Sequence, residues 1–444
     1  MIVEKSKFSF VIAVCTLLLL ACDKQKAREV PSIPHDPNVP IQLTDFIPDS
    51  GGMSTQVIIR GSNFGTDASQ LKVYFNHKEA KVVRTIGDLA YVLAPRLPGD
   101  TCIVSVVMGN DSIQYKKPFY YRPKVQVSTI SGTPHSERES VDGTLVEARF
   151  DNPWYIAVDR EKNILVGEWK ARARLINEER NSVVTLLNTT AYGEMASGCT
   201  DKDGKTFYFP MNGAPYYYEF DPEKQWLARR VNPTKRAGDD FDLTGKYSLA
   251  FNELDSSLYT ITTQGELVKI DPRTHEASLV KKGILKDRVQ SSLQVYLTFH
   301  PIDKHILYFV NPSSMAPNDG PIPGTDRIYR MDMRTLEVED YAGSGIKGHS
   351  DGPKELAQFS NPCQISFDSD GNLYVGDTDN YCVRMITPQG VVSTIAGIPG
   401  TSGYLDGDPD VALFDRFWGM KIDVDGTLYI SDYYNRCIRK ITIQ

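Results

Sequence analysis

The sequence has little of what a metal centre, a disulfide-stapled domain or a nucleic-acid-binding protein needs. Its seven cysteines form no Cys-x-x-Cys pair and its seven histidines are scattered, so no metal site and no cofactor are expected. The formal net charge is −7 and there is no basic stripe, which argues against nucleic acid as a partner. No apolar run is long enough to cross a bilayer as a helix. Short β-branched and aromatic segments separated by Asp, Asn, Gly and Pro instead predict an all-β protein.

The one marked apolar run lies at the start of the chain. Residues 8–21 follow Lys5 and Lys7, are too short to span a membrane, and end in Leu-Leu-Ala before Cys22. This segment resembles a bacterial lipoprotein signal peptide. The resemblance implies that residues 1–21 are removed and that the acylated Cys22 anchors the mature chain to a membrane. An ordinary signal peptide is the alternative.

Residues 22–40 have the composition of a tether. Charged residues follow Cys22 and give way to spaced prolines, a pattern typical of a solvated, extended linker. The resemblance to lipoproteins places the anchor in the cell envelope, at the outer membrane. Some surface lipoproteins of Bacteroidota carry an acidic cluster after the acylated cysteine. Here Asp23 alone precedes basic residues, so either face of that membrane stays open.

Residues 41–122 predict a separate small β domain. The turn Ile-Pro-Asp-Ser-Gly-Gly is followed by Val-Ile-Ile-Arg-Gly-Ser-Asn-Phe-Gly, then by Val-Tyr-Phe-Asn and, near the end, by Phe-Tyr-Tyr. In this order the segment resembles an IPT/TIG domain, which implies an immunoglobulin-like sandwich. Such modules serve as spacers or contact surfaces, and the fold by itself assigns no activity.

The end of the chain contains one sequence pattern twice. Many residues recur at a fixed offset of about 55 positions, a period typical of propeller blades. Among them Asp351, Phe359, Asp377 and Arg384 recur as Asp406, Phe414, Asp432 and Arg439. A third copy begins near Asp142, and its distance from the others predicts six blades of about 52 residues, or seven if the intervening blades are shorter.

The repeated motifs also indicate a family and a way to close the ring. The pattern Phe-x-x-Pro, Asp-x-x-Gly-Asn-Leu-Tyr-Val, Asp-x-x-Asn and Ile-Arg-x-Ile resembles NHL-repeat propellers over residues 124–444, strongly in three blades and weakly in three. The last copy stops at Gln444, before an outermost strand. Residues 127–130 match the outermost strand of the preceding copy. We therefore expect residues 127–130 to complete the last blade and remove its exposed edge.

One face of such a propeller is the predicted binding site. The loop before each innermost strand and the loop between the second and third strands open on this face. Aromatic rings stack on sugar rings, and carboxylates and guanidinium groups bind hydroxyls, so the residue types in these loops suit a glycan. The candidate ligand-binding residues are Trp154, Tyr155, Glu168, Trp169, Arg172, Asp377, Tyr381, Trp418, Asp432, Tyr433, Tyr434 and Arg436.

Some of these residues have a structural alternative. Trp154 and Trp418 can plug the mouth of the channel, and Asp377 and Asp432 can cap turns of their blades. A long loop at residues 311–326 is expected to overhang the same face.

The favoured hypothesis is a membrane-anchored, non-catalytic protein that captures a glycan or another extended ligand. Its resemblance to Bacteroidota lipoproteins implies a place beside an outer-membrane importer complex. Two alternatives stay open. Asp377 and Asp432 can support a glycan hydrolase or lyase if their carboxyl groups lie about 5 to 9 Å apart. The propeller can also be a scaffold for protein–protein interaction in the envelope.

Overall fold

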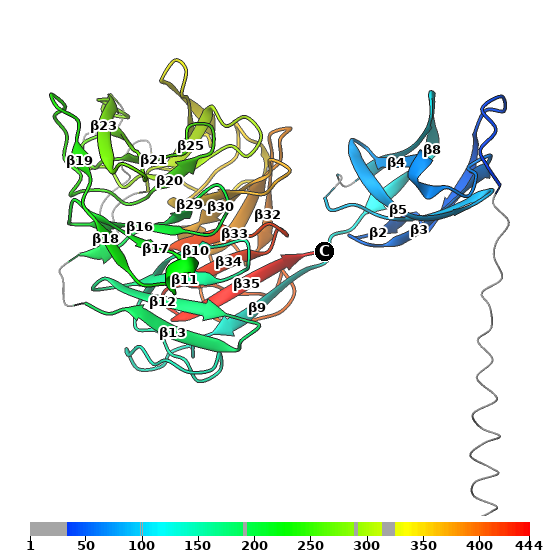
Figure 1. The fold of residues 1–444 in the computed structure, drawn as a ribbon. Coiled ribbons are helices and arrows are strands. Elements are labelled where there is room, and N and C mark those ends of the chain that lie inside the picture. Colours follow the sequence, from blue (N-terminus) through cyan, green and yellow to red (C-terminus); the bar gives the residue numbers. More distant parts are fainter. Residues whose placement is uncertain (1–32, 98, 100, 190–192, 288–291, 313–324) are drawn as a thin grey trace, which may run out of the picture. The chain divides into compact units, whose positions relative to one another are not determined.

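The computed structural model describes residues 33–97, 99, 101–189, 193–287, 292–312 and 325–444. Over these residues the chain forms strands and three short 3-10 helices without any α-helix, so the predicted all-β fold is confirmed. The chain divides into two compact units, one reaching Lys124 together with Gln444, the other spanning Val125–Ile443 (Figure 1). The predicted signal peptide and Cys22 lie outside the described residues. In the described part of the chain no helix has the length and apolar character to cross a membrane.

The first unit is a β-sandwich. Along β7 the side chains alternate between the surface and the core, so that Cys102, Val104 and Val106 are buried. In the core Phe119 packs edge to face on Phe75, with 4.9 Å between ring centres. The strands hydrogen-bond in the order β1-β3-β6-β5-β4-β7-β8-β2. Their bounds are β1 (Gln42–Ile47), β2 (Ser50–Gly51), β3 (Gln56–Ser62), β4 (Leu71–Phe75), β5 (Lys78–Ile86), β6 (Leu89–Leu93), β7 (Thr101–Met108) and β8 (Asp111–Tyr121).

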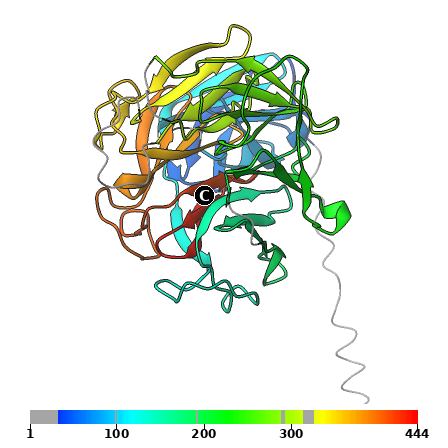
Figure 2. The same ribbon diagram turned by 90° about the vertical axis from the view of Figure 1, so that its left-hand side faces the viewer.

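The second unit is a six-bladed propeller (Figures 1 and 2). Its inner strands contact one another in the ring order β10, β15, β20, β24, β29, β33 and back to β10. Six blades, not seven, are therefore present.

Blade 1 consists of β10 (Pro153–Val158), β11 (Ile164–Glu168), β12 (Arg172–Asn177) and β13 (Ser182–Leu187). Blade 2 consists of β14 (Glu194–Met195), β15 (Cys199–Thr200), β16 (Phe207–Asn212), β17 (Tyr217–Phe220) and β18 (Arg229–Val231). Blade 3 consists of β19 (Thr234–Lys235), β20 (Ala250–Asn252), β21 (Ser257–Ile261), β22 (Leu267–Ile270) and β23 (Glu276–Lys281). Blade 4 consists of β24 (Tyr296–Phe299), β25 (Ile306–Val310), β26 (Ile328–Asp332) and β27 (Glu337–Ala342). Blade 5 consists of β28 (Gly352–Pro353), β29 (Pro362–Phe367), β30 (Leu373–Asp377), β31 (Cys382–Ile386) and β32 (Val391–Ala396). Blade 6 consists of β33 (Gly419–Ile422), β34 (Leu428–Asp432), β35 (Cys437–Ile443) and β9 (Val125–Ser131).

The sixth blade joins the two ends of the propeller. Its outermost strand is β9, which pairs antiparallel with β35 and places Thr129 opposite Arg439. The backbone N–H of Thr129 donates to Asp406 Oδ2 at 3.0 Å, and its hydroxyl lies 2.8 Å from that of Tyr404. The expected closure by residues 127–130 is confirmed, with a strand somewhat longer than predicted.

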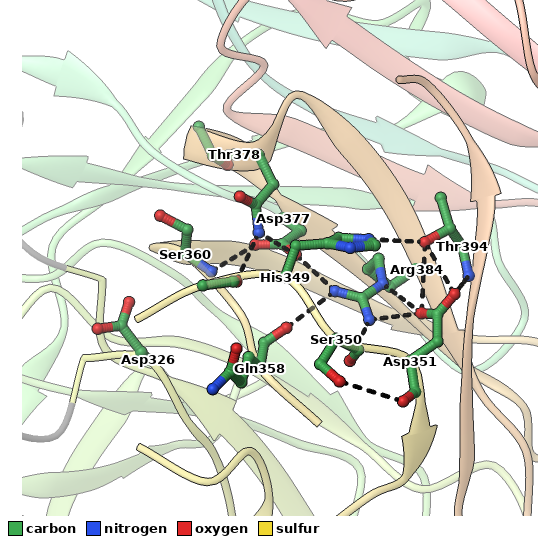
Figure 3. A network of polar contacts seen from close by, with 12 residues as sticks. Asp326, His349, Ser350, Asp351, Gln358, Ser360, Asp377, Thr378, Arg384 and Thr394 are labelled. Atoms are coloured by element: carbon green, nitrogen blue, oxygen red, sulfur yellow. Dashed lines mark hydrogen bonds and ion pairs between the residues drawn. The ribbon is translucent and has the colours of Figure 1, made fainter. Parts of the chain in front are cut away.

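A buried arginine holds each blade that the sequence repeat marks. In blade 5, Arg384 Nη1 donates to Asp377 Oδ2 at 2.8 Å and Nη2 to Asp351 Oδ1 at 2.6 Å (Figure 3). The guanidinium also covers the ring of Phe359 at 5.0 Å. The same contacts recur in blade 6 with Arg439, Asp432, Asp406 and Phe414, and in blade 1 with Arg174, Glu168, Asp142 and Phe150. The repeat in the sequence is therefore the repeat of one ion-paired clamp.

This clamp corrects the prediction for three candidate ligand-binding residues. Asp377, Asp432 and Glu168 are at most 1% exposed, so a ligand on the loop face does not reach them. Their second carboxylate oxygens fix the loop before the innermost strand, by accepting from the backbone N–H groups of Ser360, Asp415 and Asp151 respectively. The structural alternative for the two aspartates is the correct one, and it extends to Glu168.

Two side-chain contacts cross the axis of the propeller. The hydroxyls of Tyr155 and Tyr296 join blades 1 and 4, and Ser197 Oγ donates to Gln364 Oε1 at 3.2 Å between blades 2 and 5. Tyr155 is fully buried, so its prediction as a ligand contact is wrong. The loop face lies at one end of the inner strands, and the far end of the channel lies at the other. These contacts lie between the two ends.

Candidate functional site

Five aromatic side chains from blades 1 and 6 form a cluster on the predicted loop face. Trp154 is at its centre and lies 6.1 Å from Trp169, 6.1 Å from Trp418 and 4.8 Å from Tyr433 between ring centres. Tyr434 extends the cluster by packing edge to face on Tyr433 at 4.9 Å. We call these five residues the aromatic cluster. The predicted radial arrangement thus brings together side chains that are far apart in the sequence.

Two rings of the aromatic cluster face solvent, and their turns explain why. Trp169 follows β11, where Lys170 and Ala171 adopt positive φ values of 60° and 51° and reverse the chain within a tight loop. The equivalent loop after β34 carries Tyr434 and ends at Arg436, whose φ is 55°. Trp169 is 38% exposed and Tyr434 46% exposed, so both rings are available for stacking.

The other two tryptophans support these rings from below. Trp154 and Trp418 are 3% and 2% exposed, so the expectation that they contact a ligand directly does not hold in this conformation. Their burial is compatible with the alternative that they plug the mouth of the channel. Tyr433 is half-buried between the two groups.

Polar atoms without a partner gather beside the aromatic cluster. Trp154 Nε1, Trp418 Nε1 and Glu194 Oε2 are buried and accept or donate no hydrogen bond within the described residues. Glu194 bridges to Trp169 through the backbone and interacts electrostatically with Tyr433. Burial raises the pKa of Glu194, partly opposed by a hydrogen bond from Asn212. Because native proteins satisfy nearly all buried polar groups, these three atoms are available to hydrogen-bond water or a ligand.

The remaining candidates lie in, or at the end of, the loops between the second and third strands of blades 1, 5 and 6. Arg172 is partly buried, donates to Ser140 Oγ and lies 3.7 Å from Glu168 Oε2. Tyr381 ends the short helix η3 (Thr378–Asn380) of blade 5. Arg436 is half-buried at the end of its loop.

Sequence reasoning missed three residues of this face. Glu194 and Tyr247 belong to blades 2 and 3, where the repeat is weak, and both lie near Tyr155. Arg416 lies 3.4 Å from Asp379 and interacts with Tyr381 and Tyr434, so it links blade 5 to the cluster. Arg416 stands shortly before β33, in one of the two loop types that define the predicted face, and this position is the signal that could have identified it. Most of the predicted overhanging loop, residues 313–324, lies outside the described residues.

The described residues contain no group of three or more His, Cys, Asp or Glu side chains that could hold a metal ion. His300, for example, uses its Nδ1 atom to accept from the backbone N–H groups of Ile302 and Asp303. The cysteines of the two folded units, Cys102, Cys199, Cys363, Cys382 and Cys437, are all free thiols.

Comparison with known proteins agrees with this architecture. Residues 41–121 match the IPT/TIG domain family. Over almost its whole length the chain resembles a protein of unknown function from Bacteroides thetaiotaomicron, with a TM-score of 0.77, 27% identity, and coverage of 93% of this chain and 100% of the other. The N-terminal unit is thus an IPT/TIG domain, followed by the six-bladed propeller.

Two further solved structures are described as auxiliary nutrient binding proteins. The one from Bacteroides thetaiotaomicron has a TM-score of 0.58, 25% identity, and coverage of 92% of this chain and 99% of its own. The one from Bacteroides ovatus has a TM-score of 0.59 and 22% identity, over 93% of this chain and 100% of its own, and shows the shared fold.

One curated protein also matches over a short stretch. Protein SUPPRESSOR OF QUENCHING 1, chloroplastic, from Arabidopsis thaliana is 37% identical over 76 residues. The match covers 16% of this chain and 7% of that protein, so the chain spans only a small part of this relative.

Proposed function

We propose that this protein is a non-catalytic binding protein that captures a glycan on the aromatic cluster of its NHL-type propeller. The observation that carries the proposal is the pair of exposed rings, Trp169 and Tyr434, mounted on buried aromatic residues. Flat, rigid rings lose little conformational entropy on binding and match the apolar faces of sugars. Arg416 interacts with Tyr434. Arg172 and Arg436 come shortly after Trp169 and Tyr434 in the sequence. These guanidinium groups are therefore the candidates for donating to hydroxyls. The resemblance to auxiliary nutrient binding proteins of Bacteroides supports a binding role.

Affinity electrophoresis and calorimetry of the purified protein with a panel of plant and host polysaccharides test this proposal. We expect one polysaccharide class to bind. Trp169→Ala should weaken that binding about tenfold or more, since a stacked ring contributes about 1 kcal/mol or more beyond its buried area. Tyr434→Ala should have a smaller effect in the same direction.

A matched control comes from the first unit. Tyr120 is 48% exposed on the IPT/TIG domain, so Tyr120→Ala removes a comparable ring from a different surface. Its affinity should equal that of the unsubstituted protein. Absence of binding across the panel, or equal losses for Tyr120→Ala and Trp169→Ala, contradicts the proposal.

The two aspartates that the hydrolase or lyase alternative needs are not exposed on the loop face. Asp377 and Asp432 are buried against Arg384 and Arg439 and do not face the aromatic cluster. We therefore expect no release of products from the bound polysaccharide. The scaffold alternative is tested by capture of a protein partner from the envelope. It is favoured if that partner binds Trp169→Ala as well as it binds the unsubstituted protein.

The proposed location is the outer membrane, through residues 1–21 as signal peptide, the acylated Cys22 and the tether of residues 22–40 ahead of the domains at 41–122 and 124–444. There the protein can pass glycan to an importer complex. Metabolic labelling with palmitate tests the anchor, because Cys22→Ser should lose the label and leave the membrane fraction. Label retained on Cys22→Ser contradicts it.

A further inference from the structure

A cavity of about 300 Å³ occupies the axis at the end of the channel away from the aromatic cluster. Each of the six blades contributes residues from the far end of its innermost strand or from the segment beside it. The axial contacts between Tyr155 and Tyr296 and between Ser197 and Gln364 belong to residues nearer the loop-face ends of the inner strands and are not part of the cavity lining. The residues used below are Cys199, Thr200, Leu249, Leu297, Thr298 and Lys421, all of which line this cavity. Its size falls at the lower end of the range for small-molecule sites.

The cavity contains an ammonium group without a counter-ion. Lys421 lies on β33, where its backbone pairs with that of Tyr429. Its ammonium makes no hydrogen bond or ion pair with a described residue, and the electrostatic neighbour that affects its pKa is the Cys199 thiol. Desolvation lowers the pKa of Lys421. Lys421 is half-buried, so its unpaired charge carries part of the desolvation cost of a buried cation, and a methionine of similar volume would avoid that cost.

The other charged groups of the cavity are already engaged. The ammonium of Lys304 is paired with the carboxylate of Glu253 at the rim. Asp201 accepts hydrogen bonds from the backbone N–H groups of Lys205 and Thr206 in its own turn. A ligand therefore meets one free positive charge, the hydroxyls of Thr200 and Thr298, and apolar walls that include Leu249 and Leu297.

We propose that this axial cavity binds a small monocarboxylic acid, with the carboxylate on Lys421 and a compact body against the apolar walls. A single cation matches a single negative charge, and a charge-assisted hydrogen bond at a half-buried group is stronger than one in open water. A phosphate dianion fits less well, because Asp201 and Glu253 line the same cavity and add negative charge. This site is separate from the aromatic cluster and independent of the function proposed there.

Thermal denaturation and calorimetry of the full chain test the site with acetate, benzoate and gluconate, each against its neutral amide. At least one acid should raise the melting temperature of the unsubstituted protein, and its amide should not. Lys421→Met should weaken the binding of that acid at least tenfold. Lys440→Met is the matched control, because Lys440 lies on β35 of the same blade and pairs with Glu178 away from the cavity; it should bind the acid normally.

The stability of Lys421→Met without ligand is a second readout. If Lys421 serves binding and its unpaired charge is unfavourable for stability, Lys421→Met should raise the urea midpoint of unfolding. A lower midpoint together with unchanged acid binding shows a structural role and overturns the proposal. Equal binding of acid and amide, or no binding of any of the three acids, also overturns it.

The pH dependence distinguishes Lys421 from other cations. Binding requires the ammonium, so affinity should fall as pH rises through the lowered pKa of Lys421. Among the groups around it, Cys199 has its pKa raised to about 12 by burial and stays neutral, and burial lowers the pKa of His300. Lys304, Glu253 and Asp201 keep their own partners, as described above. Affinity that stays constant up to pH 10 contradicts the assignment to Lys421.

Discussion

The hydroxyl oxygens of Tyr155 and Tyr296 lie 2.5 Å apart on the axis of the propeller. They come from blades 1 and 4, which face each other across the ring, so one hydrogen bond connects opposite sides of the fold. Burial raises the pKa of both phenols well above its usual value, which keeps both protonated at any ordinary pH.

Removing either hydroxyl should destabilise the propeller. Tyr155→Phe and Tyr296→Phe each leave one buried hydroxyl without this partner, which costs about 1 to 2 kcal/mol of the free energy of unfolding. The double variant should lose less than the two single losses together, because no hydroxyl is then left unpaired. Urea unfolding followed by tryptophan fluorescence measures all three. Strictly additive losses contradict the contact.

The clamp of blade 5 predicts a strong effect of Arg384→Met. This change leaves the carboxylate of Asp377 buried without its ion-pair partner, and we expect a loss of about 3 to 5 kcal/mol in unfolding free energy at pH 8. Adding Asp377→Asn should restore part of it, since the amide oxygen can still accept from Ser360. If the double variant is no more stable than Arg384→Met alone, the carboxylate is not the source of the loss.

The same variant has a defined pH dependence. Burial raises the pKa of Asp377 to about 6, and removal of Arg384 raises it further. The folded variant therefore holds a proton that the unfolded chain has released above about pH 4, so its stability falls as pH rises through this window. The deficit of Arg384→Met relative to the unsubstituted protein should be smaller at pH 5 than at pH 8. A deficit that grows on acidification contradicts this assignment.

The clamp also explains what the sequence could and could not predict. Arg384 pairs with both Asp351 and Asp377, so a copy of the blade that keeps the clamp must keep one arginine and two acidic residues at fixed spacing, and this repeat revealed the fold. For the same reason Asp377 and Asp432 were misassigned to a ligand. Residues repeated in every well-matched blade hold the blade together, whereas Trp169 and Tyr434 stand at positions where the copies differ.

The residues that escaped prediction belong to the weak blades. Glu194 reaches the aromatic cluster from blade 2, which lacks the clamp motif, and nothing in the local sequence sets its register against Trp169. Lys421 looks like one more residue of a half-buried strand. Its isolation becomes visible only when the six inner strands are assembled, because the two carboxylates of the same cavity, Asp201 and Glu253, have other partners among the described residues.

The side chain of Lys246 links blades 2 and 3. It is fully buried, and its ammonium donates to the backbone carbonyls of Met211, Ala214 and Leu243 at 3.1, 2.6 and 2.6 Å. Lys246→Met leaves these carbonyl oxygens without their donor. At pH 10 the Lys246 amine is neutral and can donate two hydrogen bonds, so we expect a loss of about 2 kcal/mol there.

Burial lowers the pKa of Lys246 to about 7. Between this value and the usual range for lysine the unfolded chain binds more protons than the folded protein, so the contribution of Lys246 to stability rises with pH. The difference between the unsubstituted protein and Lys246→Met should therefore increase from pH 7 to pH 10 in urea titrations. A difference that shrinks over this range contradicts the lowered pKa.

Thr129→Pro tests how much the joined ends of the ring contribute. Proline cannot donate the N–H that Thr129 gives to Asp406, and Asp406 also binds Arg439, so the change disturbs both the closing strand and the clamp of blade 6. Thr394→Pro is the matched control, because Thr394 gives the same N–H to Asp351 in blade 5, where both strands belong to one continuous segment. Each change should cost at least about 2 kcal/mol for the lost charged hydrogen bond.

The loss for Thr129→Pro should be the larger of the two, because β9 reaches β35 only by closing the whole propeller into a ring, and a detached β9 frees both ends. Hydrogen exchange should then show protection lost in all six blades for Thr129→Pro and mainly in blade 5 for Thr394→Pro. Equal losses confined to one blade in both variants would mean that the ring stays closed without β9.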